Sequence, residues 1–252
     1  MTSVVERFSY VNFDNYFVRK ETKVICNNAF KDCNGLTRVV IPEGVEIIGN
    51  NAFSGCGSLI DVFLPDSLIF IGDYAFEGSY RLHNIELPQS LSILGNGAFR
   101  GCHHLNEIII PASVNIINGN PFMGTHVDIN CLTPHYKYDS NEELLYATNS
   151  KMLVSCMSTK THYVIPKYIK SIGKDAFSGS YIENVTIPKT VDYIAQDSFS
   201  GGMIHKVSIQ NPDIIVNPNA FNGAWGLRSI KVPSKVRGKY MLMFPRYAAL
   251  IK

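Results

Sequence analysis

A phenylalanine recurs along this chain at a nearly constant interval. It occupies eight positions, separated by steps of 23, 23, 23, 23, 55, 22 and 22 residues: Phe30, Phe53, Phe76, Phe99, Phe122, Phe177, Phe199 and Phe221. A period of about 20 to 29 residues is typical of a solenoid, because one unit cannot bury its own apolar face and its neighbours must cover it. We therefore expect a stack of coils with this phenylalanine column as its internal spine.

Each unit also contains the pattern L-x-x-V-x-I-P, as in residues 36–42 and 59–65. The alternating V-x-I part predicts a short strand with one buried face, and the proline ends the strand because it cannot donate to a ladder. Apolar residues in the second half of a unit, such as Val45, Ile48 and Ala52, are expected to face the same core.

The residues around each phenylalanine predict a turn. Two residues after it comes glycine in seven of eight units, with Asp32 as the exception, and we expect a positive φ there. Two residues before it stands Asn or Asp in most units, which we interpret as the cap of a short helical turn. These positions are Asn28, Asn51, Asn120, Asp175, Asp197 and Asn219.

The unit at residues 41–59, I-P-E-G-V-E-I-I-G-N-N-A-F-S-G-C-G-S-L, resembles the leucine-rich repeat of the BspA-like family of bacterial and protist surface proteins. The resemblance spans roughly residues 23 to 233. It implies a right-handed, mostly β leucine-rich repeat solenoid, with a parallel concave sheet and short helical turns on the convex side. It also implies surface display and binding of other proteins, without catalytic residues.

Five segments are expected to form one continuous domain. Residues 1–22, rich in aromatics such as Phe8, Tyr10 and Phe13, predict an N-terminal cap made of a strand pair. Residues 23–124 and 161–233 are the repeat arrays. Residues 125–160 resemble the hairpin unit between such arrays, expected to project from the solenoid or bend it, as a spacer or a ligand contact. Residues 234–252 resemble the closing cap of the family.

That closing segment is basic and has no acidic residue, but its charges flank an apolar run. We therefore interpret it as an amphipathic cap rather than a site for anionic lipid or nucleic acid. The resemblance places Tyr240, Tyr247 and Ile251 at the matching positions of the family's cap.

The composition excludes several classes of protein. With 46% hydrophobic and 17% charged residues and a net charge of +2, the chain is neither disordered nor a nucleic-acid coat. No apolar run reaches the roughly 18 residues of a membrane span. Motifs for nucleotides and nucleophilic catalysis are missing, so we expect no enzyme and no cofactor. We expect no metal at Cys102, His103 and His104 either, because adjacent residues rarely converge on one ion.

The six cysteines are not spaced like a disulfide framework. Cys33, Cys56 and Cys102 share one column, in which other units carry Ser, Thr, Gly or Ala. Such a column favours small buried residues, so we expect free thiols there. Only Cys131 and Cys156 are candidates for a pair, across the predicted hairpin.

The positions between the buried residues of the V-x-I strands point outward and form a candidate binding face. Its first half combines apolar residues with acids, and its last units are basic. The candidate residues are Val40, Asp61, Phe63, Glu86, Glu107, Ile109, Lys206, Arg228 and Lys231. We place the central contact at Phe63 and Ile109, flanking Glu86. Alternatively, these residues favour strand geometry and pack on one another.

Two functions follow. The first is a non-enzymatic adhesion module that binds a protein or glycoprotein through the concave sheet, with no nucleic acid and no membrane span. The second is a structural spacer that displays a neighbouring domain. The resemblance implies a cell-surface or secreted protein, but Glu6 and Arg7 stand where a signal peptide would be apolar. Unpaired thiols suit a reducing compartment, so a cytoplasmic location stays open.

Overall fold

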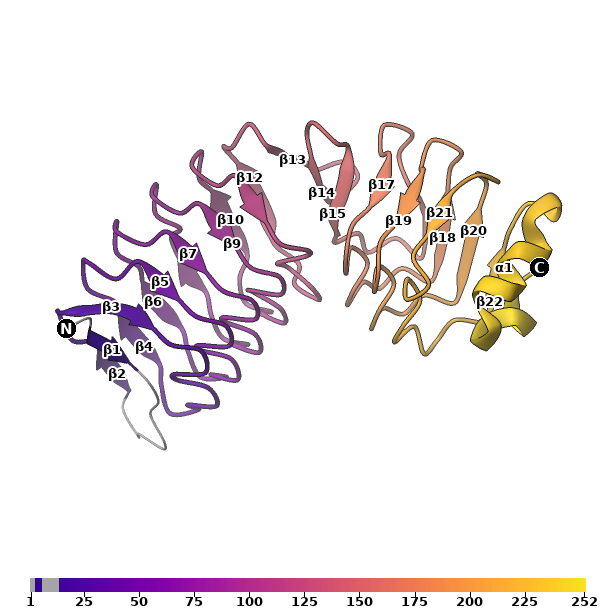
Figure 1. The fold of residues 1–252 in the computed structure, drawn as a ribbon. Coiled ribbons are helices and arrows are strands. Elements are labelled where there is room, and N and C mark those ends of the chain that lie inside the picture. The colour runs from indigo at the N-terminus through magenta and orange to yellow at the C-terminus, as the bar shows by residue number, and fades with distance from the viewer. Residues whose placement is uncertain (1–2, 6–13) are drawn as a thin grey trace. The chain divides into compact units, whose positions relative to one another are not determined.

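The protein is a solenoid of short parallel strands joined by turns (Figure 1), as the repeat predicts. The computed structural model describes residues 3–5 and 14–252. The chain forms two compact units, Met1–Tyr138 and Asp139–Lys252.

The strands of the first unit form one six-stranded sheet, one four-stranded sheet and one separate pair. One sheet contains, in order, β1 (Ser3–Val5), β3 (Thr22–Ile25), β5 (Ile47–Ile48), β7 (Phe70–Ile71), β9 (Ile93–Leu94) and β11 (Ile116–Ile117). The V-x-I strands of the pattern form β2 (Asn15–Phe17), β4 (Arg38–Val40), β6 (Asp61–Phe63) and β8 (Asn84–Ile85), followed by a separate pair, β10 (Glu107–Ile110) and β12 (Asp128–Cys131). Neighbouring strands pair in parallel with a shift of one repeat, so that Val39 lies beside Val62.

The second unit repeats this arrangement. One sheet contains β14 (Leu144–Ala147), β15 (Met152–Cys156), β17 (Ser171–Ile172), β19 (Tyr193–Ile194) and β21 (Ile215–Val216). The V-x-I strands are β16 (His162–Val164), β18 (Asn184–Ile187), β20 (Lys206–Ile209) and β22 (Ser229–Lys231). Strand β13 (Tyr136–Asp139) lies at the boundary of the units, and η1 (Ser234–Val236), α1 (Arg237–Met243) and η2 (Pro245–Leu250) close the chain.

The phenylalanine column is the spine of both units. In the first unit five rings stack nearly parallel, with centroid distances that grow from 4.9 Å at Phe30–Phe53 to 6.0 Å at Phe99–Phe122. In the second unit the two stacked pairs are each 5.2 Å apart. Each such pair contributes about 0.5 to 1.5 kcal/mol beyond the burial of its rings, so the spine ties neighbouring coils together within each unit.

The turn after each phenylalanine has the expected backbone. All seven glycines adopt a positive φ, and Asp32 adopts the same conformation with φ 61°. The expected helical caps are wrong, however, because Asn28, Asn51, Asp175 and Asp197 themselves have positive φ, and the described repeats contain turns instead of helices. Asn and Asp suit these positions because they tolerate the left-handed region better than most residues other than glycine.

Asn120 does act as a cap, since its Oδ1 accepts the Phe122 N–H at 3.0 Å. The residue that follows it is Pro121, which disfavours helical backbone at the residue before it. The side chain of Asn120 therefore supplies the acceptor for the turn.

A polar ladder runs along the coils of the first unit. The side-chain oxygens of Asn27, Asn50, Asp73 and Asn96 each accept a backbone N–H from the next coil, at 2.7 to 2.9 Å. Close packing accompanies it, because a Cβ at Gly95 would lie 2.3 Å from the backbone of the preceding coil. The glycine is therefore needed where two backbones touch.

The small column, which contains Cys33, Cys56 and Cys102, lies three residues after each phenylalanine. Several of its side chains are hydrogen-bond donors and not merely small. Cys56 Sγ donates to Phe30 O at 3.0 Å, and Ser79, Cys102 and Thr125 make the same bond to the phenylalanine carbonyl one coil back. Burial raises the pKa of Cys56 to about 12. All six cysteines are free, so the candidate pair of Cys131 and Cys156 does not form.

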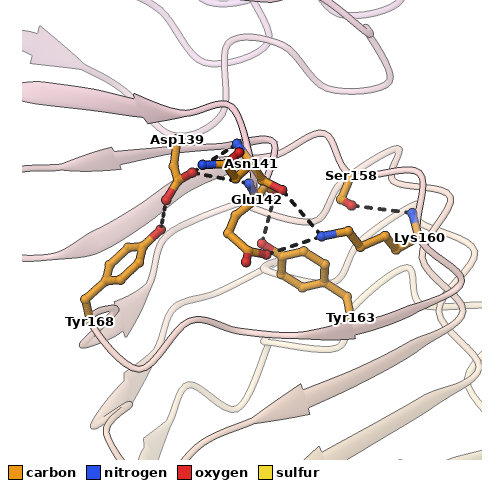
Figure 2. Close-up of polar contacts among 7 residues, drawn as sticks. All are labelled: Asp139, Asn141, Glu142, Ser158, Lys160, Tyr163 and Tyr168. Carbon is orange, nitrogen blue, oxygen red and sulfur yellow. Dashed lines mark hydrogen bonds and ion pairs between the residues drawn. The ribbon is translucent and has the colours of Figure 1, made fainter.

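The expected hairpin is present as the antiparallel pair β14 and β15. It does not project, because Leu144, Leu145 and Leu153 are fully buried and β15 continues as a parallel neighbour of β17. Figure 2 shows the contacts before and after it: Tyr163 donates to Glu142 O at 3.0 Å, Tyr168 to Asp139 Oδ2 at 2.6 Å, and Lys160 lies 3.4 Å from Glu142.

The two ends of the chain continue the sheets. Strands β1 and β2 lie in different sheets, pairing with β3 and β4, so the predicted strand pair between them is wrong. The predicted cap aromatics Phe8, Tyr10 and Phe13 lie outside the described residues.

At the other end, Tyr240 and Phe244 are buried. Ile251 bridges to Ile230, and Tyr247 donates to Phe221 O at 2.6 Å. These contacts cover the last coil.

The left-handed turn gives a reciprocal pair of predictions. We expect Asp32→Gly to raise the free energy of unfolding by on the order of 0.5 kcal/mol, because glycine relieves the strain of a side chain at positive φ. We expect Gly55→Ala to lower it by about 1 kcal/mol or more, because φ is 75° and the new Cβ would meet Asp32 Oδ1. Urea unfolding measures both, and destabilisation by Asp32→Gly would contradict this assignment.

Thiol counting tests the cysteine assignment. Protein purified without reductant and denatured should react with six equivalents of a thiol reagent, whereas one disulfide would leave four. In the native protein Cys56 and Cys156 should stay unlabelled at pH 8, because burial raises the pKa of each to about 12. Labelling before unfolding, located by peptide mass spectrometry, would show that the sites are open to solvent.

Candidate functional site

The V-x-I strands of the first unit present alternate residues to solvent, as the pattern predicts. Val39, Val62 and Ile108 are buried, whereas Phe63 and Ile109 are 50% and 45% exposed. Val40 is half-buried, and Glu86 and Glu107 are exposed. We call this surface the first-unit strand face: the outward residues of β4, β6, β8, β10 and β12 together with Glu86.

One end of this face carries a polar network. Arg38 Nη2 lies 2.9 Å from Asp61 Oδ2, and Asn84 Nδ2 donates to Asp61 Oδ1 at 3.0 Å. These hydrogen bonds, the one from Asn84 first, hold the pKa of Asp61 below its usual value. The Arg38 guanidinium also lies 5.5 Å from the centre of the Phe63 ring. Asp61 and Phe63 are thus held in place by neighbours on the same face.

The other end of the face is acidic. Glu107 lies in register with Asp128 on the next strand, and like charges directly opposite each other are unfavourable. Neither Glu86 nor Glu107 takes part in any ion pair found among residues 14–252. The carboxylates of this end are therefore available to a cationic group from outside.

A groove divides the face between β8 and β10. These two strands come from consecutive repeats, yet they belong to different sheets, and β8 pairs only with β6. The groove has a volume of about 540 Å³, and its polar and outward lining consists of His83, Asn84, Glu86, Gln89, Asn106, Glu107 and Ile109. The predicted central residues Glu86 and Ile109 both line it.

Two histidines connect the repeats beside the groove. His83 Nδ1 donates to His104 O at 3.0 Å, and His104 Nδ1 donates to Tyr80 O at 2.6 Å. On the other sheet β7, β9 and β11 stay paired without a break. The coils are therefore held together at the spine and on one sheet, while the strand face between β8 and β10 is open.

Lys206, Arg228 and Lys231, the basic residues of the predicted site, are exposed on or beside β20 and β22. They belong to the second unit, whereas the other six predicted residues belong to the first. The candidate site is accordingly the first-unit strand face with its groove.

The side chains of Cys102, His103 and His104 make separate contacts and do not converge on one point. Cys102 is buried and donates to Phe76 O, and the His103 ring stacks on Tyr80 at 5.8 Å. Within the described residues, no group of three or more metal-binding side chains is found, and no helix there is long and apolar enough to cross a bilayer.

Asn84, Gln89 and Asn106 were missing from the predicted site, although they line the groove. Asn84 stands in the outward column of the repeat, which is the one signal that could have identified it. Nothing in the repeat pattern marks the break of the ladder, because residues 82–88 and 105–111 both fit L-x-x-V-x-I-P.

Comparison with protein families identifies the repeat. The model of the BspA type leucine-rich repeat region, in six copies, matches residues 5–130 and 149–246. No curated protein matches the chain.

Solved structures share the fold. A leucine-rich repeat protein from Eubacterium ventriosum is 20% identical, with a TM-score of 0.62, over 92% of this chain and 78% of that one. The pneumococcal vaccine antigen PcpA is 19% identical, with a TM-score of 0.66, over 89% of this chain and 63% of that one. A leucine-rich cell surface protein from Faecalibacterium prausnitzii is 20% identical, with a TM-score of 0.50, over 86% and 78%.

Hydrogen exchange tests whether the backbones of β8 and β10 are unpaired in solution. We expect the amides of Glu107 and Ile109 to exchange at least about tenfold faster than those of Asp61 and Phe63, which hold the same positions in a paired strand. NMR at single-residue resolution measures the rates. Equal protection of the two pairs would mean that the ladder is closed in solution.

Proposed function

Because the chain belongs to the BspA-type leucine-rich repeat family, whose repeats build an extended binding surface, we propose that it is a non-enzymatic adhesion module. It binds a protein or glycoprotein through the first-unit strand face. The observation that carries this proposal is the combination, on one sheet face, of exposed Phe63 and Ile109 with the uncompensated acids Glu86 and Glu107.

Burial of these apolar side chains supplies the driving force. A fully buried Phe or Ile side chain is worth about 1.5 to 3 kcal/mol, and both are about half exposed in the free protein. Aromatic anchors near the centre of an interface dominate its energy, and surrounding charges set orientation and partner choice. Phe63 is also held in place by Arg38, so little conformational entropy is lost when a ligand covers it.

Surface display is the second part of the proposal. One structural neighbour is described as a cell surface protein and another as a vaccine antigen. These descriptions, with the shared fold, support a location at the cell surface.

A display role without a ligand is the second candidate. The contacts of Arg38 with Phe63 and Asp61 favour it, because they explain the exposed ring by packing within the face. This reading predicts that no ligand depends on the strand face.

A binding screen decides between the two. The purified chain is tested by surface plasmon resonance against extracellular-matrix proteins and glycans, beside the double variant Phe63→Ser/Ile109→Ser. We expect a saturable ligand whose affinity falls at least about tenfold in the variant, which corresponds to about 1.4 kcal/mol.

The matched control is Ile47→Ser/Ile116→Ser, which removes two exposed apolar side chains from the other sheet of the same unit. Its affinity should be unchanged. Equal loss in both variants, or no ligand in the screen, would argue for the display role.

A further inference from the structure

The groove between β8 and β10 interrupts the first-unit strand face, whose other neighbouring strands are paired by backbone hydrogen bonds. We propose that it is a binding site for an extended basic peptide segment of the protein ligand. The segment lies along the groove, hydrogen-bonds to backbone groups that β8 and β10 leave unpaired, and places a Lys or Arg side chain between Glu86 and Glu107. This assignment rests on the proposed function, since it names the part of the ligand that the strand face takes.

The hydrogen bonds of the outer neighbours show which backbone groups face the groove. Asp128 N–H donates to Asn106 O, and Leu132 N–H donates to Ile110 O. The even-numbered residues of β10 therefore bond to β12, and Glu107 and Ile109 direct their N–H and C=O groups towards β8.

The same reasoning applies to the opposite edge. Asn84 N–H donates to Ile60 O, so Asn84 faces β6, and Ile85 and Leu87 face β10. Each edge thus presents alternate N–H and C=O groups with the spacing of a strand. An extended chain carries donors and acceptors with the same alternation, so it can reach these groups from within the groove.

Burial makes these groups costly to leave without partners. The side chains of Ile85 and Leu87 are each 7% exposed, so their backbone is close to the core. A buried donor or acceptor without a partner costs about 1 to 3 kcal/mol. A peptide backbone in the groove would supply partners to these groups through directed hydrogen bonds.

The side chains around the groove select the charge of the segment. Two carboxylates line it, and its lining contains no Lys or Arg. The amides of Asn84, Gln89 and Asn106 can both donate and accept, which suits a peptide backbone. An acidic segment would be repelled, whereas a basic one neutralises Glu86 and Glu107.

A peptide titration tests the assignment. The probe is a capped heptapeptide of alternating Thr and Lys, added to isotope-labelled full-length chain and followed by NMR. We expect saturable shifts at the amides of Ile85, Leu87, Glu107 and Ile109, with a dissociation constant below a millimolar. A peptide with Glu in place of Lys should cause no shifts, and N-methylation of the Lys peptide should weaken binding at least about tenfold because it removes backbone donors.

Charge variants test the carboxylates. Glu86→Gln/Glu107→Gln should weaken binding of the Lys peptide at least about tenfold and flatten its dependence on salt. Glu46→Gln is the control, because Glu46 is an exposed glutamate directly before β5 on the other sheet. Equal affinity of the double variant and the control would overturn the charge assignment.

The outcome is separable from that of the proposed function. Absent shifts, or shifts confined to amides outside the groove, would overturn the peptide site, while a ligand lost in Phe63→Ser/Ile109→Ser would still support binding by the face. Groove shifts without any protein ligand in the screen would support the peptide site and argue against adhesion through Phe63.

Discussion

Every coil of this protein depends on its neighbour for partners that it cannot supply itself. The phenylalanine ring of one coil is covered by the ring of the next, and backbone donors of the turn are satisfied one coil further along, as when Phe53 N–H donates to Ala75 O. An isolated coil would expose both its ring and its backbone donors, so stability belongs to the stack. The small column follows from the same dependence, since Cys, Ser and Thr each bond the phenylalanine carbonyl behind them.

This redundancy is what allows a groove to exist. Between β8 and β10 the backbone pairing of one sheet is lost, but the phenylalanine rings of the two coils still stack and the strands of the other sheet stay paired. The ring spacing also increases along the first unit towards its last coil. Opening one of several parallel connections costs far less than opening all of them. The solenoid can therefore carry a local opening with unpaired backbone, which a fold held by a single sheet could not tolerate.

Some of this architecture can be read from the residues, and some cannot. The spine, the V-x-I strands and the positive φ after each phenylalanine follow from the repeat, because each depends on one residue type at a fixed spacing. The helical caps at Asn28 and Asn51 were wrong because Asn serves equally well as a cap and as a left-handed residue. The groove could not be predicted, because it depends on whether two neighbouring strands approach closely, and His83 and His104 follow no column that marks this.

The polar ladder of Asn27, Asn50, Asp73 and Asn96 has a direction, because each side chain accepts a backbone N–H from the coil that follows it. The coils are consequently interchangeable modules with a head and a tail. Removing or duplicating one whole period joins an acceptor to the same kind of donor as before, whereas a change of a few residues within a coil would disturb the register between that coil and its neighbours. Array length can thus vary in steps of one coil, and with it the reach of the surface, without the invention of any new contact.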